Sequence, residues 1–403
     1  MAHLLQKVTV KNYRSLADVS VDLMPVNVLF GPNGAGKSTF LDVLWFVWDC
    51  SVRGVDMACA ARGQGLGLLW QGADMNEPLA FLLEMSGLQY ELSLRLAAGR
   101  IEPFPGERLS APGGRTLFER KPGSPRIEVP RSQDYSLKID LREPDKLGIS
   151  RYLDSLLPLE EPDAELVVAL DELLRLMHFL HARSFSLYDL KKHGSEASHE
   201  IRIGWNGQNL WSVLRNLHDR QRIDDRYETI MRFMTRCFPS FDGLAFEQTG
   251  AGSLYGLFVE KGRQRPIAPL AISDGHLQML LLLAALFSEG RTVASVLLLD
   301  EPELSLHPWA LAVLAEAVKF ATVEWNKQVF IATHSPVLLS QFDAADSFAV
   351  ERREGRTHLK RVSEIEGIED LLQQYAMGAL YMAELVAPQH PGRAEAGGKG
   401  EDD

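Results

Sequence analysis

The stretch Gly31-Pro-Asn-Gly-Ala-Gly-Lys37-Ser38 decides the fold. It fits the pattern GxxxxGK[ST], and it stands between an apolar strand predicted over Val26–Phe30 and a helix predicted over residues 39–48. Its glycines let the backbone curl, so that N–H groups and the helix N-terminus can surround phosphates. Lys37 brings positive charge to the β and γ phosphates, and Ser38 is suited to bind Mg²⁺. The stretch therefore predicts a P-loop that binds ATP and Mg²⁺.

Two carboxylates follow a second apolar strand far downstream, in Val296-Leu-Leu-Leu-Asp300-Glu301-Pro302. Asp300 is expected to hold the magnesium shell from the side opposite the P-loop. Glu301, one residue further, can polarise the attacking water as general base. An acidic helix cap is the alternative for Glu301 alone. Because the pair follows a strand of the buried type, the sequence favours an ATPase that hydrolyses ATP to ADP and phosphate.

Two further motifs belong with these. The apolar run over residues 328–332 leads into Thr333-His334-Ser335-Pro336, and a histidine at the end of a strand lies where ligands bind in open α/β sheets. His334 can donate a hydrogen bond to the γ-phosphate or to the water. The stretch Ser273-Asp-Gly275-His-Leu-Gln278 precedes an apolar helix over residues 279–287, and such a helix start suits an anion, although a capped core helix is the alternative.

The spacing of apolar residues divides the chain into regions. Alternating patterns over residues 79–85, 90–96, 126–129 and 136–141 predict an antiparallel layer. Helical spacing predicts helices over residues 163–181, 209–219 and 224–238. The last third alternates strands and helices, as in a parallel sheet covered by helices. We therefore expect an N-terminal ATPase lobe (1–143), a mainly helical insertion (144–268), a C-terminal ATPase lobe (269–386) and a disordered tail (387–403).

Composition limits the possible partners. A net charge of −12 and a pI near 5.5 disfavour a surface that is basic throughout, although one basic face could still bind DNA. Three cysteines without CxxC spacing suggest neither a disulfide framework nor a zinc cluster. The sequence shows no apolar signal core and no run long enough to cross a bilayer, so we expect a cytoplasmic protein without a membrane partner.

The four motifs occur in the order Walker A, signature, Walker B with D-loop, and switch histidine, and together they resemble ABC-type ATPases of the SMC and RecF kind. ISDGHLQML, LLLDEPELSLHP and FIATHSPVLL resemble more narrowly the RecF-like predicted AAA/ABC ATPases, which include the ATPase parts of OLD-family nucleases and several phage-defence systems. The resemblance implies an α/β ABC-type P-loop head with a mixed or parallel sheet, an antiparallel β layer and an inserted helical subdomain.

The resemblance also implies a set of site residues. ATP is sandwiched between two copies of the chain, with Ser273 and Gly275 of one copy facing the P-loop of the other. The resemblance implies that Glu301, His334 and Lys37 are catalytic and that Ser38 and Asp300 bind the metal. The nucleotide-binding residues are expected to be Arg14, Asn33, Gly34, Ala35, Gly36, Lys37, Ser38, Thr39, Ser273 and Gly275.

The sequence departs from this pattern in two places. The signature reads SDGHLQ where transporters have SGGQ, and no Q-loop glutamine is evident, Gln71 being only a candidate. His178 and His181 are expected on one helix face as packing or surface residues, without the acidic neighbours that a metal site needs. Basic residues at 191–193 and 215–226 alternate with Asp219, Asp224 and Asp225, which favours a solvated face over a nucleic-acid contact.

Two functions remain open. One is an ATP-driven switch that acts on DNA in DNA repair or phage defence. The other is a regulatory scaffold in which ATP holds an oligomer that restrains a separately encoded effector, such as a nuclease or toxin, without touching DNA. Both require a homodimer or a higher even-numbered homo-oligomer.

Overall fold

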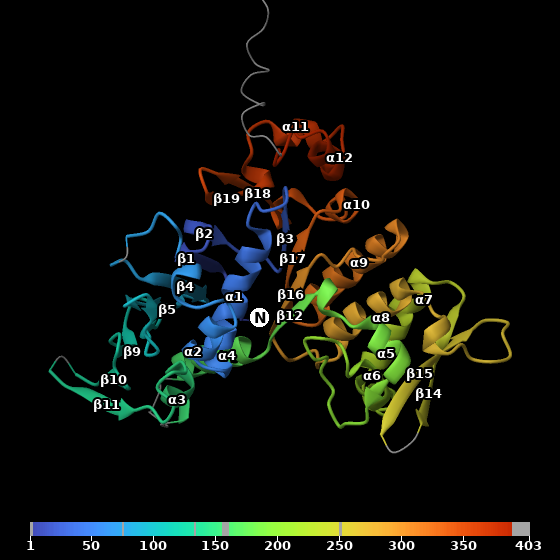
Figure 1. Ribbon diagram of the computed structural model, residues 1–403, viewed down its shortest axis with the longest axis horizontal. Coiled ribbons are helices and arrows are strands. Elements are labelled where there is room, and N and C mark those ends of the chain that lie inside the picture. Colours follow the sequence, from blue (N-terminus) through green and yellow to red (C-terminus); the bar gives the residue numbers. More distant parts are fainter. Residues whose placement is uncertain (1–2, 75, 133, 155–160, 250–251, 389–403) are drawn as a thin grey trace, which may run out of the picture.

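The computed structural model describes residues 3–74, 76–132, 134–154, 161–249 and 252–388. A six-stranded sheet occupies its centre (Figure 1). Five strands are parallel and the sixth closes an antiparallel hairpin at one edge. In spatial order the strands are β12 (Met177–His181), β16 (Ser295–Asp300), β17 (Lys327–Thr333), β3 (Val26–Phe30), β18 (Ser347–Arg353) and β19 (Arg356–Arg361).

The middle of the central sheet is buried on both faces, because β3, β16 and β17 are mostly apolar and buried at every position. Val296 and Leu298 of β16 pack with helix α1 (Lys37–Val52), whereas Leu297 and Leu299 pack with helices α8 (Asp274–Phe287) and α9 (Pro308–Glu324). Successive strand residues point to opposite faces, so one strand supplies both cores. Motifs that follow the strands therefore meet at one sheet edge.

An antiparallel sheet of eight strands lies beside α1, on the left of Figure 1. The predicted antiparallel layer is thus confirmed, with two strands, β8 and β9, that the sequence analysis did not predict. The strands in spatial order are β11 (Ser136–Asp140), β10 (Arg126–Pro130), β9 (Thr116–Arg120), β8 (Gly106–Ser110), β5 (Leu88–Leu94), β4 (Leu79–Met85), β1 (Lys7–Tyr13) and β2 (Leu16–Asp22). A small hairpin of β6 (Leu96–Ala97) and β7 (Arg100–Ile101) and the helix α2 (Val55–Ala60) complete this side.

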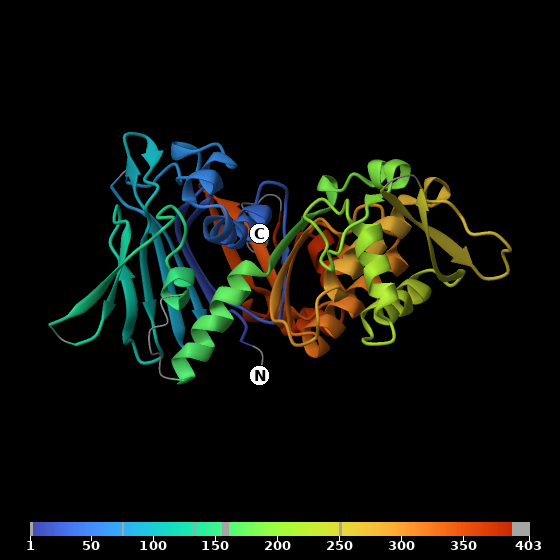
Figure 2. The same ribbon diagram turned by 90° about the horizontal axis from the view of Figure 1, so that it is seen from below.

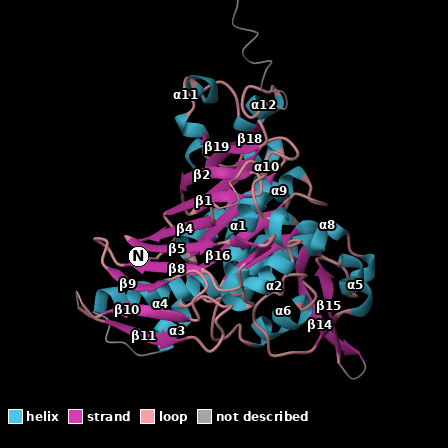
Figure 3. Cartoon of the chain, turned by 60° about the vertical axis from the view of Figure 1, so that its left-hand side comes forward, coloured by secondary structure: helices cyan, strands magenta, loops and turns pink. Residues whose placement is uncertain are grey.

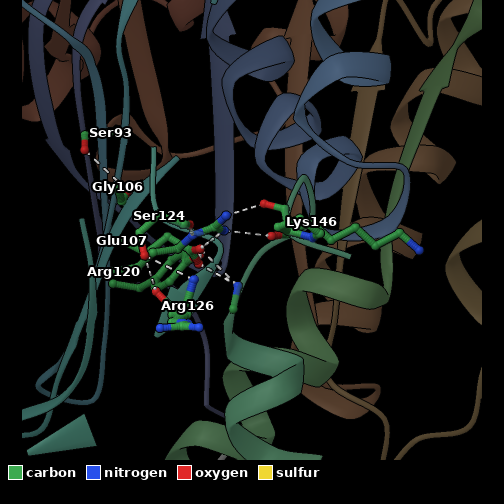
Figure 4. Close-up of polar contacts among 10 residues, drawn as sticks. Ser93, Gly106, Glu107, Arg120, Ser124, Arg126 and Lys146 are labelled. Carbon is green, nitrogen blue, oxygen red and sulfur yellow. Dashed lines mark hydrogen bonds and ion pairs between the residues drawn. The ribbon is translucent and has the colours of Figure 1, made fainter. Parts of the chain in front are cut away.

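A buried ion pair fastens this sheet to the chain that leaves it (Figure 4). Arg120 on β9 contacts Glu107 on β8 at 3.0 Å, and neither side chain is exposed. Tyr90 donates to the same carboxylate at 2.6 Å, as does the backbone N–H of Gly148 at 2.8 Å. The guanidinium also donates to the carbonyl of Lys146 at 3.1 Å. A buried charge is tolerated only when its hydrogen bonds are made, and here they tie two strands to the entry of helix α3 (Ile149–Asp154).

The stretch between residues 144 and 268 is divided in space. Helix α4 (Glu161–Arg175) packs against α1 next to the central sheet (Figure 2), whereas α6 and α7 pack against α8 on the other side. The predicted helix over residues 163–181 is wrong for its last residues, which form β12 and pair in parallel with β16. His178 and His181 therefore lie on a strand, not on one helix face. The elements on the far side are α5 (Leu187–His193), α6 (Leu210–Asp219), α7 (Arg226–Cys237), β13 (Ser195–Glu196), β14 (Phe241–Thr249) and β15 (Ser253–Glu260).

The described part of the chain ends beside the edge hairpin β18–β19, at the top of Figures 1 and 3. Three short helices lie there: α10 (Pro336–Leu339), α11 (Ile368–Leu372) and α12 (Met377–Met382). The predicted tail falls almost wholly on residues 389–403, outside the described residues. Within the described part, no helix is long and apolar enough to cross a bilayer.

Candidate nucleotide-binding site

The loop between β3 and α1 has a conformation that depends on glycine. Gly34 and Gly36 adopt φ angles of 75° and 112°, in the left-handed region. A Cβ on Gly36 would lie 2.2 Å from Oγ1 of Thr357. That hydroxyl, on β19, donates to the carbonyl of Ala35 at 2.8 Å. The hairpin β18–β19 thus packs directly on the loop and holds its shape.

Lys37 opens helix α1 and folds back over the loop. Its ammonium donates to the carbonyls of Gly31 at 2.9 Å and Pro32 at 3.0 Å. Burial lowers the pKa of Lys37 to about 8, against the opposing effect of nearby carboxylates, Asp300 first. A cation held by two loop carbonyls can turn to an anionic phosphate at small cost, because those carbonyls are neutral acceptors.

Ser38 and Asp300 bring the first two motifs together. The Ser38 hydroxyl donates to Oδ1 of Asp300 at 3.0 Å, although 262 positions separate the two residues. Burial raises the pKa of Asp300, with further raising by the charge of Glu301. A buried carboxylate beside a hydroxyl suits a hard cation, and Mg²⁺ characteristically takes one or two such ligands plus phosphate oxygens. The residues present therefore fit Mg²⁺, although the described residues contain no cluster of three or more His, Cys, Asp or Glu that could hold a metal.

Glu301 follows Asp300 with a φ of 52°, an unusual value for a residue other than glycine. Arg183 lies 2.8 Å from Oε2 of Glu301, and its side chain is two-thirds exposed. His181, at the end of β12, lies 3.8 Å from Oδ2 of Asp300. The edge strand β12 thus brings a histidine and an arginine to the two acids.

His334 leaves the end of β17 half-buried. Burial lowers its pKa, and the charges of Lys37 and Arg183 lower it further, so the imidazole is neutral at pH 7. Its backbone N–H donates to Oε1 of Glu303 at 2.8 Å, and the same oxygen accepts from Oγ1 of Thr333 at 2.8 Å. Glu303 therefore fixes the strand end that carries the histidine.

These groups surround one cavity of about 720 Å³. Of the expected nucleotide-binding residues, it is lined by Arg14, Asn33, Gly34, Gly36, Lys37, Ser38 and Thr39, together with Glu301 and His334. Ala35 is buried beneath the loop. Arg14 donates to Oδ2 of Asp42 at 2.9 Å, which fixes its guanidinium at the cavity rim. The candidate Gln71 lines the same cavity.

The signature segment lies elsewhere in this copy of the chain. Ser273 stands at the N-cap position of helix α8 without a side-chain capping bond. It is exposed, and its hydroxyl lies 2.6 Å from Nδ1 of His276. Within the described residues, neither Ser273 nor Gly275 lines the cavity. A Cβ on Gly275 would lie 2.6 Å from the carbonyl of Ser305, so only glycine allows this close approach to the D-loop. One chain therefore brings together the P-loop, both acids and the histidine, but not the signature.

Two of the basic residues weighed for nucleic-acid contact, Lys191 and Arg226, are engaged within the chain. Lys191 donates to Oδ1 of Asp274 and to the carbonyl of Ile272, both at 2.6 Å, and so supports the start of α8. Arg226 is buried and donates to Asp224 at 2.7 Å and to the carbonyl of Ser288 at 2.8 Å.

Sequence reasoning missed several residues that line the cavity or contact its lining residues. Glu303 lies in the quoted Walker B stretch, so a third carboxylate near Asp300 and Glu301 could have been predicted to belong to the site. Arg183 and Arg352 carry no motif. Trp70 also lines the cavity, and the guanidinium of Arg356 lies over its ring, 4.6 Å from the ring centre. In the sequence, its position next to Gln71 was only a weak signal.

Comparisons with known proteins agree with this geometry. A sequence model of the family described as "AAA domain, putative AbiEii toxin, Type IV TA system" matches residues 26–340. The solved SMC head bound to the C-winged helix domain of ScpA has a TM-score of 0.51 at 15% identity, covering 88% of this chain and 97% of that one. At that identity the likeness shows the fold alone, an ABC-type P-loop ATPase head.

Two further SMC heads are less similar. The head domain from Thermotoga maritima has a TM-score of 0.42 at 16% identity, covering 90% of this chain and 99% of that one. The head with an extended coiled coil, bound to the C-terminal domain of ScpA from Pyrococcus furiosus, has a TM-score of 0.42 at 15% identity, with coverage of 92% and 99%. No curated protein matches the sequence.

Proposed function

The chain belongs to the AAA family whose model it matches over residues 26–340, and from this membership we propose that it hydrolyses ATP and works as an ATP-gated dimer switch. The observation that carries the proposal is the 3.0 Å hydrogen bond from Ser38 to Asp300. It joins the end of the phosphate loop to the acid that ends β16, beside the cavity that Ser38, Glu301 and His334 line. These are the positions that binding and cleaving a nucleoside triphosphate require.

The proposed chemistry assigns one task to each group. Lys37 leaves the loop carbonyls and pairs with the β and γ phosphates. Ser38 and Asp300 would hold Mg²⁺, which would supply positive charge against the charge that develops on the phosphates. Glu301 accepts the proton of the attacking water. Because Arg183 lies 2.8 Å from Glu301, the water must take the place of this ion pair or enter beside it. Neutral His334 donates a hydrogen bond to the transferred phosphoryl group.

A second copy completes the proposed site. The exposed start of α8 offers backbone N–H groups and the positive end of a fourteen-residue helix, which suit a γ-phosphate. Ser273 and Gly275 lie outside the cavity of their own chain, so a facing chain is needed to bring them to the nucleotide. ATP bound between two copies then strengthens the dimer, and hydrolysis weakens it.

For the biological role we propose DNA repair or phage defence, with a scaffold that restrains a separate effector as the second candidate. The scaffold is favoured by three large apolar side chains at the C-terminal end of the described chain: Tyr375, Met382 and Leu385 are 53%, 69% and 60% exposed. Large exposed apolar residues this close together in the sequence can contribute to a surface that a partner covers. Titration of labelled duplex DNA at low and moderate salt, with and without ATP, separates the two, because DNA binding falls steeply with salt.

The ATP cycle is tested with two variants. Lys37→Ala removes the charge that faces the phosphates and should abolish ATP binding. Glu301→Gln should keep ATP binding and lose at least about 100-fold in hydrolysis, the lower end of the range for one general base. Equilibrium binding of ATP and phosphate release are measured for both. Wild-type hydrolysis by Glu301→Gln would overturn the assignment of the base.

A further inference from the structure

A second cavity lies along β12, the edge strand of the central sheet. Its volume of about 1020 Å³ exceeds that of the nucleotide cavity. It is bounded by α1, by β12 and by the segment 199–209. The proposed ATP cycle uses none of this space, although its lining includes His181, which lies 3.8 Å from Asp300. A volume at the upper end of the roughly 300–1,000 Å³ typical of small-molecule sites suits an organic ligand.

Aromatic side chains form its walls. Trp45 and Trp48 of α1 are stacked, with ring centres 3.9 Å apart and planes at 11°. The indole N–H of Trp48 donates to the carbonyl of Arg175 at 3.2 Å, which fixes its orientation. Phe179 of β12 lies 5.8 Å from Trp45, and Trp205 is 65% exposed on the opposite segment. Rigid aromatic faces of this kind bind a planar ring by stacking.

Guanidinium groups line the same space. Three arginines pair with acids that are buried behind them, so each presents its cationic face to the cavity rather than the acid. The side chains of Arg53, Arg175 and Arg202 are 44%, 54% and 36% exposed, whereas those of their partners Asp49, Asp171 and Glu289 are 2%, 9% and 6% exposed. Among the described residues that line the cavity, Glu200 is the acidic one, and its carboxylate accepts a hydrogen bond from the amide of Asn209 at 2.6 Å. Guanidinium is the group that best recognises phosphate.

We propose that this cavity binds a small aromatic anion of the nucleotide class, a heterocycle that carries phosphate, as a second ligand distinct from the ATP in the P-loop. The heterocycle stacks on the tryptophans and the phosphate pairs with the arginines. A free nucleotide fits better than a nucleic-acid strand, because a chain with a net charge of −12 repels a long polyanion, whereas a small ligand meets only the local cations.

The position of the cavity gives the ligand a route to catalysis. Phe179 and His181 line it from β12, and the same strand ends at the two acids, where Arg183 lies 2.8 Å from Glu301. A ligand that shifts β12 changes the placement of Arg183 and thereby the freedom of Glu301. This coupling rests on the proposed ATP hydrolysis, whereas binding itself does not.

The test uses the full chain with Lys37→Ala, so that the P-loop does not compete. Titration calorimetry with thymidine and guanosine monophosphates should give saturable binding at one site per chain. Trp205→Ala removes a stacking face and should weaken binding by about fivefold or more, the lower range for one base on one aromatic ring. Arg175→Gln should weaken it as well. Trp309→Ala removes a tryptophan that is 59% exposed and does not line the cavity, and it should leave binding unchanged.

Three outcomes would overturn the inference. The first is no saturable binding of either nucleotide up to millimolar concentration in a folded protein. The second is equal weakening by Trp205→Ala and Trp309→Ala. The third is binding of a ten-nucleotide oligodeoxythymidylate without binding of the monophosphates, which would show that the cavity binds a nucleic-acid strand. The coupling is measured separately, as a change in phosphate release by the chain with Lys37 intact when the monophosphate is added; unchanged release at saturation rejects the coupling and leaves the proposed ATPase standing.

Discussion

Glu303 offers a sharp test of how the strand ends are positioned, because it touches no expected ligand. Its Oε1 accepts from Oγ1 of Thr333 and from the backbone N–H of His334, both at 2.8 Å. Glu303→Ala removes both bonds and leaves the N–H at the start of the His334 turn without its acceptor. Glu303→Gln keeps an oxygen at nearly the same place but loses the charge. The two variants therefore separate the acceptor from its charge.

The size of the effect follows from these two bonds. A hydrogen bond to a charged acceptor contributes about 1.5–3 kcal/mol. We take the loss of transition-state stabilisation to equal the free energy of only one of these bonds. Because about 1.4 kcal/mol corresponds to a factor of ten in rate, kcat should then fall by at least about tenfold. Glu303→Gln should lose less than Glu303→Ala. The KM for ATP should stay within about threefold, because Lys37 and Ser38 keep their partners.

Steady-state phosphate release over a range of ATP concentrations gives kcat and KM for each variant. Glu324→Ala serves as the control, because it removes an exposed glutamate whose ion pair with Arg291 spans 3.6 Å. Wild-type kcat in Glu303→Ala would refute the positioning role. Loss of ATP binding as complete as in Lys37→Ala would refute it too, because Glu303 would then act on the phosphates rather than on His334.

Three further outcomes follow from the same contacts. Because burial holds the pKa of free Lys37 near 8 and bound phosphate must raise it, ATP binding takes up a proton above pH 8; affinity should fall there by up to about tenfold per pH unit, as measured by titration between pH 7 and 9.5. Gly36→Ala places a Cβ 2.2 Å from Oγ1 of Thr357 at a φ of 112°, so the loop must distort and ATP affinity should fall at least about tenfold in the same titration. Arg120→Ala leaves the Glu107 carboxylate buried without its cation and should lower the free energy of unfolding by about 3–5 kcal/mol in urea titrations, whereas an unchanged midpoint would show that the pair stabilises nothing.

Much of this fold was readable from the sequence, because the decisive residues are consecutive. The strand Val26–Phe30 was predicted with its observed bounds, and Asp300, Glu301 and His334 fall at strand ends as expected. Consecutive residues of this kind predict a parallel sheet well, because its buried strands are apolar runs and the residues that bind ligands follow the ends of those runs.

The failures have physical causes as well. The run 177–181 continues a helical pattern after α4, yet it pairs with β16 and completes the sheet edge, a tertiary contact that no local pattern reveals. Arg183 reaches Glu301 only because β12 lies beside β16, so its place could not be predicted without that pairing. The division of the chain into lobes at residues 143 and 268 stays a prediction.

The central claim, that two copies share each nucleotide, is tested most directly by complementation. Lys37→Ala removes the P-loop charge, and Ser273→Arg places an unpaired charge at the start of α8, so each variant alone should be inactive. If subunits exchange, a mixed dimer holds one intact composite site, and phosphate release should return toward about half the wild-type rate per dimer. Demonstrated exchange without any recovery, or wild-type hydrolysis by Ser273→Arg alone, would contradict the composite site.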